Sequence, residues 1–191
     1  MKIIYLDTET TGVDPKVNDI IQLAGIVEID GQEMDTIELK VQPFDYNNIS
    51  PEALQVNGIT LEQLRTFMPP KEGHGQLTRF LGKFINKFDK LDKFTIAGQK
   101  VDFDAGFLRE FFFKAGDQYY GSWFNYRHVD LLAFTRLLRY AGRLTIENDK
   151  LTTVAEHFGV SLNAHDALED IRATRELLKM LIDRYLVKEA T

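Results

Sequence analysis

The hydrophobic pattern of the chain predicts strands first and helices later. An apolar run at Ile3–Leu6 is followed by a second at Ile20–Ile29, and a third segment, 37–41, alternates apolar and polar residues. A period of two residues is typical of strands with one buried face. Because Asp30-Gly31 is a common hairpin turn, we expect three antiparallel strands to open the domain.

Helical spacing dominates the remainder of the chain. Ser50-Pro51-Glu52 and Thr60-Leu61-Glu62-Gln63 are typical helix starts. Apolar residues recur at intervals of three and four from Leu77 to Phe88, and short strands are expected at Phe94–Ala97 and near Arg127–Val129. Strands that come first and then alternate with helices predict an α/β domain with a mixed sheet covered by helices.

Composition narrows this picture mainly by exclusion. The 191 residues suit one domain, expected to span 1–191, and the absence of cysteine excludes disulfides and thiolate metal sites. No apolar stretch approaches the roughly 20 residues of a membrane helix, so a cytoplasmic protein without membrane contact is the simplest expectation. The net charge of −6 disfavours a broad basic surface for long duplex nucleic acid, but leaves open a local site where bound cations supply the positive charge.

Two carboxylates end the first apolar run. Asp7 and Glu9 are two residues apart, so their side chains would point to the same face of a strand. Like charges this close need a cation, and hard divalent ions such as Mg²⁺ often bind through one or two carboxylates plus substrate phosphates. The pair predicts metal-dependent phosphate chemistry, although the segment 8–12 taken alone also fits an ordinary exit from a strand into a turn.

A third carboxylate is predicted to face inward from a helix. If this helix begins near Asp102, then Asp104 falls on the same stripe as Leu108, Phe111 and Ala115. A carboxylate on an apolar stripe is costly unless it is paired or binds a metal. Asp102 has the simpler interpretation of a helix N-cap, so we favour Asp104 as the functional acid.

A fourth carboxylate and a histidine lie at the start of the last helix. Asp166 followed by Glu169 resembles a capping box, which places the helix start there and His165 on the preceding loop. Asp170 then shares a stripe with apolar residues such as Leu177 and points towards the core. The other three histidines are interpreted as structural or exposed, whereas His165 has an acid close behind it.

Together these segments resemble the DEDDh class of 3′→5′ exonucleases, which includes proofreading subunits of bacterial DNA polymerases, RNase T and oligoribonuclease. The segments that carry the resemblance occur in the order Asp7–Gly12, Phe103–Leu108 and His165–Asp170. The resemblance implies a ribonuclease H-like fold with a mixed five-stranded sheet flanked by helices. It implies two Mg²⁺ ions, for which Mn²⁺ substitutes, and His165 as the general base. The residues it assigns to the two ions are Asp7, Glu9, Asp104 and Asp170.

The same resemblance implies contacts to the substrate. Proofreading relatives carry a Glu like Glu52 and usually a His where this chain has Asn57, so both residues are expected at the terminal nucleotide. Thr10 and Thr11, with the backbone around them, are expected to meet the terminal 3′-hydroxyl. The expected activity is release of nucleoside monophosphates from the 3′ end of single-stranded nucleic acid, DNA favoured, by two-metal-ion hydrolysis.

Other assignments stay open at this point. An RNA-trimming exoribonuclease of the RNase T or oligoribonuclease type, and a proofreading subunit active within a DNA polymerase complex, would share the motifs. A binding module that has lost catalysis is disfavoured by the complete set of four acids and His165. Because only 21 residues follow Asp170, we expect a stand-alone enzyme rather than a polymerase-bound subunit.

Three further clusters have no role in this assignment. The aromatic residues of Tyr119–Tyr126 fit a core or an oligomer contact better than a base-stacking platform. The run Phe111–Phe113 exceeds what one helix face buries, so a homodimer is one expectation. Arg136, Arg139 and Arg143 lie at helical spacing, either as a phosphate track or, as we prefer here, as solvated side chains.

Overall fold

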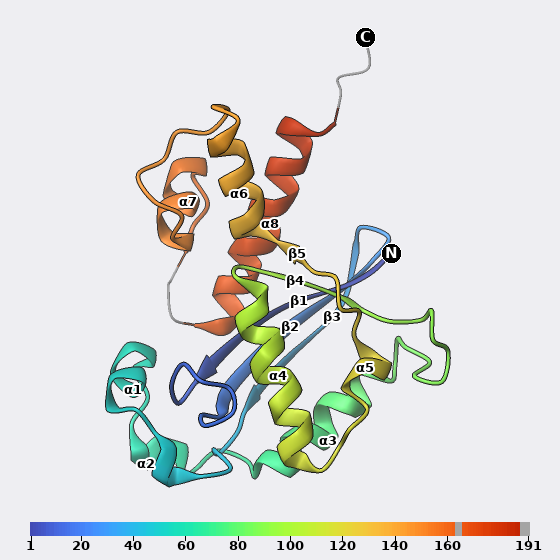
Figure 1. Ribbon diagram of the computed structural model, residues 1–191, viewed down its shortest axis with the longest axis vertical. Coiled ribbons are helices and arrows are strands. Elements are labelled where there is room, and N and C mark those ends of the chain that lie inside the picture. The colour runs from blue at the N-terminus through green and yellow to red at the C-terminus, as the bar shows by residue number, and fades with distance from the viewer. Residues whose placement is uncertain (163–165, 188–191) are drawn as a thin grey trace.

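A mixed sheet with helices on both faces forms the protein (Figure 1). The computed structural model describes residues 1–162 and 166–187. The strands, in sheet order, are β3 (Gln32–Lys40), β2 (Ile20–Ile29), β1 (Lys2–Thr10), β4 (Thr95–Gly98) and β5 (Val129–Asp130). The β1–β2 and β2–β3 pairs are antiparallel, whereas the β1–β4 and β4–β5 pairs are parallel. The expected α/β class and five-stranded mixed sheet are confirmed.

The helices divide into groups by the face of the sheet that they cover. In chain order they are α1 (Pro51–Asn57), α2 (Leu61–Leu64), α3 (Pro70–Leu81), α4 (Val101–Ala115), α5 (Tyr120–Trp123), α6 (Leu131–Tyr140), α7 (Leu151–Phe158) and α8 (Ala167–Tyr185), with a 3₁₀ helix, η1 (Tyr46–Asn48), before α1. Helices α3, α4 and α5 bury one face, and α6, α7 and α8 bury the other. No helix within residues 1–162 and 166–187 is long and apolar enough to cross a membrane.

Strand β1 is the centre of the sheet and supplies side chains to both cores. Leu6 belongs to the core on the α4 side, and Tyr5 belongs to the core on the α8 side. Because successive side chains of a strand point to opposite faces, Thr8 faces α4, whereas Asp7 and Glu9 face α8. The predicted placement of the two acids on one face therefore holds.

Local sequence signals set several of the element ends. Asp30 and Gly31 have φ of 50° and 85°, the left-handed backbone of the expected two-residue hairpin turn. Ser50 caps α1, and Thr60 with Gln63 forms the capping box of α2. The helix starts expected at these positions are confirmed.

Apolar spacing beyond α3 does not continue the helix. Although residues at 84, 85 and 88 keep the helical interval, α3 ends at Leu81. Ile85 lies after the turn that follows α3 and is buried, whereas Phe88 is 86% exposed. The spacing after Leu81 therefore reflects packing of a turn against the core and not a longer helix.

The aromatic segment 119–126 is divided between core and surface. Tyr120, Trp123 and Phe124 are buried in the core on the α4 side, as expected. Tyr119 and Tyr126 are exposed. The segment thus contributes three core side chains and leaves two rings in solvent.

One carboxylate caps two helices on opposite faces of the sheet. Asp130 accepts hydrogen bonds from the backbone N–H groups of Lys100 (3.2 Å) and Val101 (3.0 Å) at the start of α4. It also accepts from the backbone N–H groups of Leu132 (2.8 Å) and Ala133 (3.3 Å) at the start of α6. The starts of α4 and α6 are therefore tied to the same side chain.

The N-cap role expected for Asp102 is wrong. Asp102 lies inside the first turn of α4, and its exposed side chain pairs with His128 Nδ1 at 3.0 Å. The physical reason is that α4 begins at Val101, before Asp102, and the backbone N–H groups at this start already donate to Asp130 from a distant segment. His74 packs edge-on against Phe112, in agreement with the structural interpretation of that histidine.

We expect Asp130→Ala to lower the free energy of unfolding by about 2 kcal/mol, because each lost N-cap contributes about 1 kcal/mol. Asp102→Ala is the matched control, since an exposed ion pair contributes at most about 1 kcal/mol. Urea denaturation followed by circular dichroism measures both changes. Equal losses in the two variants would contradict the shared cap.

Candidate active site

The four acids predicted from the sequence meet at the end of β1. Asp7 and Glu9 come from β1, Asp104 from the first turn of α4, and Asp170 from the first turn of α8. All four line one cavity of about 350 Å³, hereafter the acidic cavity. Carboxylate oxygens of Asp7, Glu9 and Asp170 lie within 4.8 Å of one another. The structure thus brings together side chains from three separate elements.

The local structure of each element explains why these side chains converge. The β1–β2 register shifts between Glu9 and Thr10, and such irregularities change the direction of a strand at its end. Asp166 Oδ1 caps α8 by accepting from the backbone N–H groups of residues 168 and 169, each at 3.1 Å. The predicted start of the last helix is confirmed, and it places Asp170 close to Asp7 and Glu9 at the end of β1.

Thr8 holds Asp104 in place and was not predicted from the sequence. Its backbone N–H and its hydroxyl donate to Asp104 Oδ1 at 3.0 Å and 2.7 Å. Asp104 is only 3% exposed, so these bonds satisfy an oxygen that solvent barely reaches. The signal available in the sequence was a polar residue between Asp7 and Glu9, which strand alternation sends towards α4.

Burial and mutual repulsion disfavour the charged forms of these acids. Burial raises the pKa of Asp7 well above its ordinary range, and the charges of Asp104 and Glu9 raise it further. Burial, followed by the charges of Asp170 and Asp166, raises the pKa of Glu9 to about 7. Burial also raises the pKa of Asp104, against its own hydrogen bonds, which lower it. A bound cation would favour the charged form of each ligand, and this set of oxygen donors suits Mg²⁺ or Mn²⁺.

A second cavity, of about 430 Å³, adjoins the acids on the side of α1 and is called the α1 cavity below. Its walls include Thr8, Glu9, Val13 and Phe103, which also line the acidic cavity. Three residues predicted to contact substrate line it as well: Thr10, Glu52 and Asn57. Asn57 Nδ2 donates to the carbonyl oxygen of Thr10 at 2.9 Å, which fixes α1 against the end of β1.

Thr11 lies behind the α1 cavity and does not line it. The side chain is buried, and its hydroxyl oxygen accepts from the backbone N–H of Asp19 at 2.9 Å. Its backbone N–H donates to the carbonyl oxygen of Asp19 at 2.8 Å, and its carbonyl oxygen accepts from the backbone N–H of Ser50 at 2.8 Å. Thr11 therefore shapes the turn after β1.

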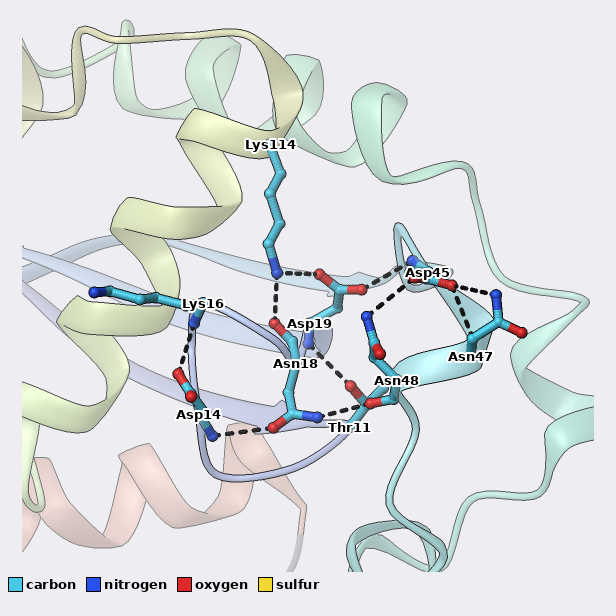
Figure 2. Close-up of polar contacts among 9 residues, drawn as sticks. All are labelled: Thr11, Asp14, Lys16, Asn18, Asp19, Asp45, Asn47, Asn48 and Lys114. Carbon is cyan, nitrogen blue, oxygen red and sulfur yellow. Dashed lines mark hydrogen bonds and ion pairs between the residues drawn. The ribbon is translucent and has the colours of Figure 1, made fainter.

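A polar network fastens this turn to α4 and η1 (Figure 2). Lys114 Nζ, at the end of α4, donates to Asp19 Oδ1 and to the carbonyl oxygen of Asn18, both at 2.8 Å. Asp19 Oδ2 accepts from the backbone N–H of Asp45 at 3.0 Å. A Cβ added to Gly12 would lie 2.4 Å from the Asn18 side chain, so a larger residue there would push this side chain out of its hydrogen bonds. The wall of the α1 cavity is thus braced from two directions.

The predicted general base, His165, lies outside the described residues. The segment concerned is 163–165, between the described ranges 1–162 and 166–187. Its role stays a prediction.

Known sequences resemble the chain over nearly its whole length. The family model described as Exonuclease (RNase_T) matches residues 4–178. The DNA polymerase III PolC-type of Thermotoga petrophila is 29% identical over 181 residues, and that of Halalkalibacterium halodurans is 27% identical over 191 residues. These matches cover 94% and 100% of this chain but only 12% of each relative.

Solved structures share the fold. Escherichia coli Exonuclease I in complex with a dT13 oligonucleotide has a TM-score of 0.80 at 21% identity. A moderately thermophilic Exonuclease I from Methylocaldum szegediense has a TM-score of 0.78 at 24% identity. Each likeness covers 96% of this chain and 41% of the other. Identities this low show the fold alone, and they confirm the expected ribonuclease H-like architecture.

We expect the metal-free protein to lose stability as the pH rises. The pKa of Glu9 is about 7 in the folded protein and 4.5 ordinarily, so the folded state binds this proton more tightly than the unfolded state. The stability that this difference contributes is fully present at a pH below the ordinary pKa of Glu9. It is lost as the pH rises through the pKa that Glu9 has in the folded protein. Thermal melts in EDTA at several pH values measure the loss, which should be smaller in Glu9→Gln.

The exposed acid Glu156, changed to Gln, is the matched control and should leave the pH dependence as in the wild type. Added Mg²⁺ should raise the melting temperature more at high pH than at low pH, because protons and the cation compete for the same oxygens. An identical pH dependence in Glu9→Gln and the wild type would contradict the assignment.

Proposed function

We propose, because this chain belongs to the RNase T family of exonucleases, that it shortens single-stranded nucleic acid from the 3′ end and releases nucleoside monophosphates. The family match confirms the predicted enzyme class at the level of an exonuclease, and the 3′→5′ direction and the DEDDh type belong to the proposal. The observation that carries the proposal is the meeting of the four acids in one cavity beside a second cavity large enough to be a binding site.

The residues present fit a divalent metal centre. Oxygens of three acids approach one another within 4.8 Å, and burial, followed by the charges of Asp170 and Asp166, raises the pKa of Glu9 to about 7. Asp7, Glu9 and Asp170 would hold the ions, two Mg²⁺ or Mn²⁺, together with Asp104, which lines the same cavity from α4. When bound, such ions stabilise the attacking and leaving oxygens of an in-line phosphodiester displacement.

The chain itself supplies binding, orientation and a proton acceptor. In this proposal the α1 cavity takes the terminal nucleotide, with Phe103 as an apolar wall and Glu52 and Asn57 as polar contacts. Thr10 lines the same cavity, while Thr11 contributes by shaping the turn behind it. His165 takes a proton from the attacking water, a role suited to an imidazole with an ordinary pKa of about 6.5.

DNA is the favoured substrate in this proposal. The relatives at 27–29% identity are named DNA polymerase III, which supports DNA over the RNA-trimming alternative. The same names support the second candidate, a proofreading role within a DNA polymerase, although the chain spans 12% of those proteins.

A homodimer and a cytoplasmic location also stay predictions. Phe111 and Phe112 are buried, so only Phe113, 64% exposed, remains of the aromatic run that suggested a dimer. Light scattering on the purified protein measures its oligomeric state.

We expect single-stranded DNA labelled at its 5′ end to give a ladder of shortening products, and DNA labelled at its 3′ end to release the labelled mononucleotide first. Mg²⁺ or Mn²⁺ should support both reactions and EDTA should abolish them, because the acids require a cation. The matched RNA should be digested more slowly. Faster digestion of RNA would favour the RNA-trimming alternative, and products released from the 5′ end would contradict the proposal.

We expect Asp104→Asn to lower kcat by more than about 100-fold, since residues that only support a metal ligand already contribute 10–100-fold. His165→Ala should lower kcat by about 10²- to 10⁴-fold, the contribution of a general base, while Mn²⁺ binding survives. Isothermal titration calorimetry separates the two cases. Asp102→Asn, an exposed acid on the same turn of α4, is the control and should keep wild-type kinetics; ordinary activity in Asp104→Asn would refute the assignment.

A further inference from the structure

A third cavity begins where the acidic cavity ends. It has a volume of about 910 Å³ and lies between α6 and the segment that leads into α7; we call it the α6–α7 groove. The groove shares Gln99, Lys100 and Asp170 with the acidic cavity. The α1 cavity shares a different set of residues with the acidic cavity and none with the groove. The acidic cavity therefore adjoins both of the others, and we call the three cavities together the trough.

The α6–α7 groove is more basic than the rest of the trough. Within the described residues, four cationic side chains line it against three acids, Glu147, Asp149 and the shared Asp170. The cationic side chains are those of Lys100, Arg136, Arg139 and Lys150. This end of the trough has a positive balance in a chain whose net charge is −6.

One acid arranges two of these cations. Asp149 accepts from Arg136 Nε at 3.0 Å and from Arg139 Nη1 at 2.6 Å, so a single negative charge is shared by two guanidinium groups. The Arg136 side chain is 66% exposed, and Asp149 occupies only its Nε. Within residues 1–162 and 166–187 the outer nitrogens of Arg136 have no hydrogen-bond partner, so they can bind a phosphate through paired donors.

The arginine pair is connected to the acidic cavity through Gln99. The Gln99 side chain lines both cavities, and its Nε2 donates to the carbonyl oxygen of Asp149 at 2.9 Å. Asn148, next to Asp149, accepts at its Oδ1 from the backbone N–H of Lys150 (3.0 Å) and the hydroxyl of Thr153 (2.8 Å). The two guanidinium groups are therefore held in place before any ligand arrives, which lowers the entropic cost of binding.

We propose that the α6–α7 groove binds backbone phosphates of the strand on the 5′ side of the scissile bond. The inference rests on the proposed function: with the terminal nucleotide in the α1 cavity and the scissile bond at the acids, the next nucleotides continue into the groove. Arginine and lysine side chains neutralise phosphates without reading the base sequence. The groove would favour long single strands over mononucleotide esters and would hold them for successive cleavages.

Arg136→Ala and Lys150→Ala test this inference with two substrates of different reach. One is a dodecathymidylate, and the other is the p-nitrophenyl ester of thymidine 5′-monophosphate, which has no upstream strand. We expect kcat/KM on the oligonucleotide to fall about tenfold, the loss of one hydrogen bond to a charged group, while the ester reaction changes less than twofold. The slope of log(kcat/KM) against log[NaCl] should become shallower by about 0.7 for each phosphate that the variant no longer neutralises.

Arg143→Ala is the matched control. Arg143 lies just beyond α6, over the ring of Tyr185, and is not among the residues lining the groove. The Arg143→Ala variant removes the same charge as Arg136→Ala and should leave both reactions and the salt slope as in the wild type.

The possible outcomes distinguish a failure of the inference about the groove from a failure of the proposed function. Oligonucleotide kinetics and a salt slope in Arg136→Ala equal to those of Arg143→Ala would overturn the inference and leave Arg136 a solvated side chain. Equal losses on both substrates would also overturn it, because the arginine would then act at the acids. A wild-type protein that hydrolyses neither substrate would overturn the proposed function together with the inference.

Discussion

The crowding of four carboxylates at the end of β1 is the constraint on which the rest of the structure depends. Burial and repulsion oppose their charged forms, as the raised pKa of Glu9, about 7, indicates. Two of the acids lie in the first turns of α4 and α8, where the helix dipole places partial positive charge that reduces the repulsion. A bound cation would relieve the repulsion that remains, and this relief adds to the free energy of cation binding. The fold thus keeps its centre in a state that favours metal capture.

The sequence revealed the acids because each follows a short-range pattern. A period of two placed Asp7 and Glu9 on one face of a strand, and apolar stripes of period 3.6 pointed Asp104 and Asp170 inward. These patterns depend only on the geometry of a single element. The order of the elements was then enough to predict a mixed sheet covered by helices, which the structure has.

The parts that could not be predicted involve partners distant in the sequence. Thr8 and Asp104 are 96 residues apart, and nothing in either segment encodes that the hydroxyl of one meets the carboxylate of the other. The prediction that Asp102 caps α4 failed for the same reason, because a local rule selects the nearest Asp and cannot find Asp130. The connection of Gln99 to Asp149 likewise spans 50 residues. Such contacts are decided by packing, which pattern rules do not describe.

The division of β1 between two faces also limits how this chain can change in evolution. Asp7 and Glu9 face α8 while Thr8, between them, bonds to Asp104 on α4. Removal or insertion of one residue in β1 would exchange the two faces of the strand beyond that point. Thr8 would then face Asp170 on the α8 side, and Asp7 and Glu9 would point into the apolar core on the α4 side. An added residue at the exposed Asp30-Gly31 turn has no such effect. Length variation among relatives is therefore expected at the hairpin turn and not within the strand.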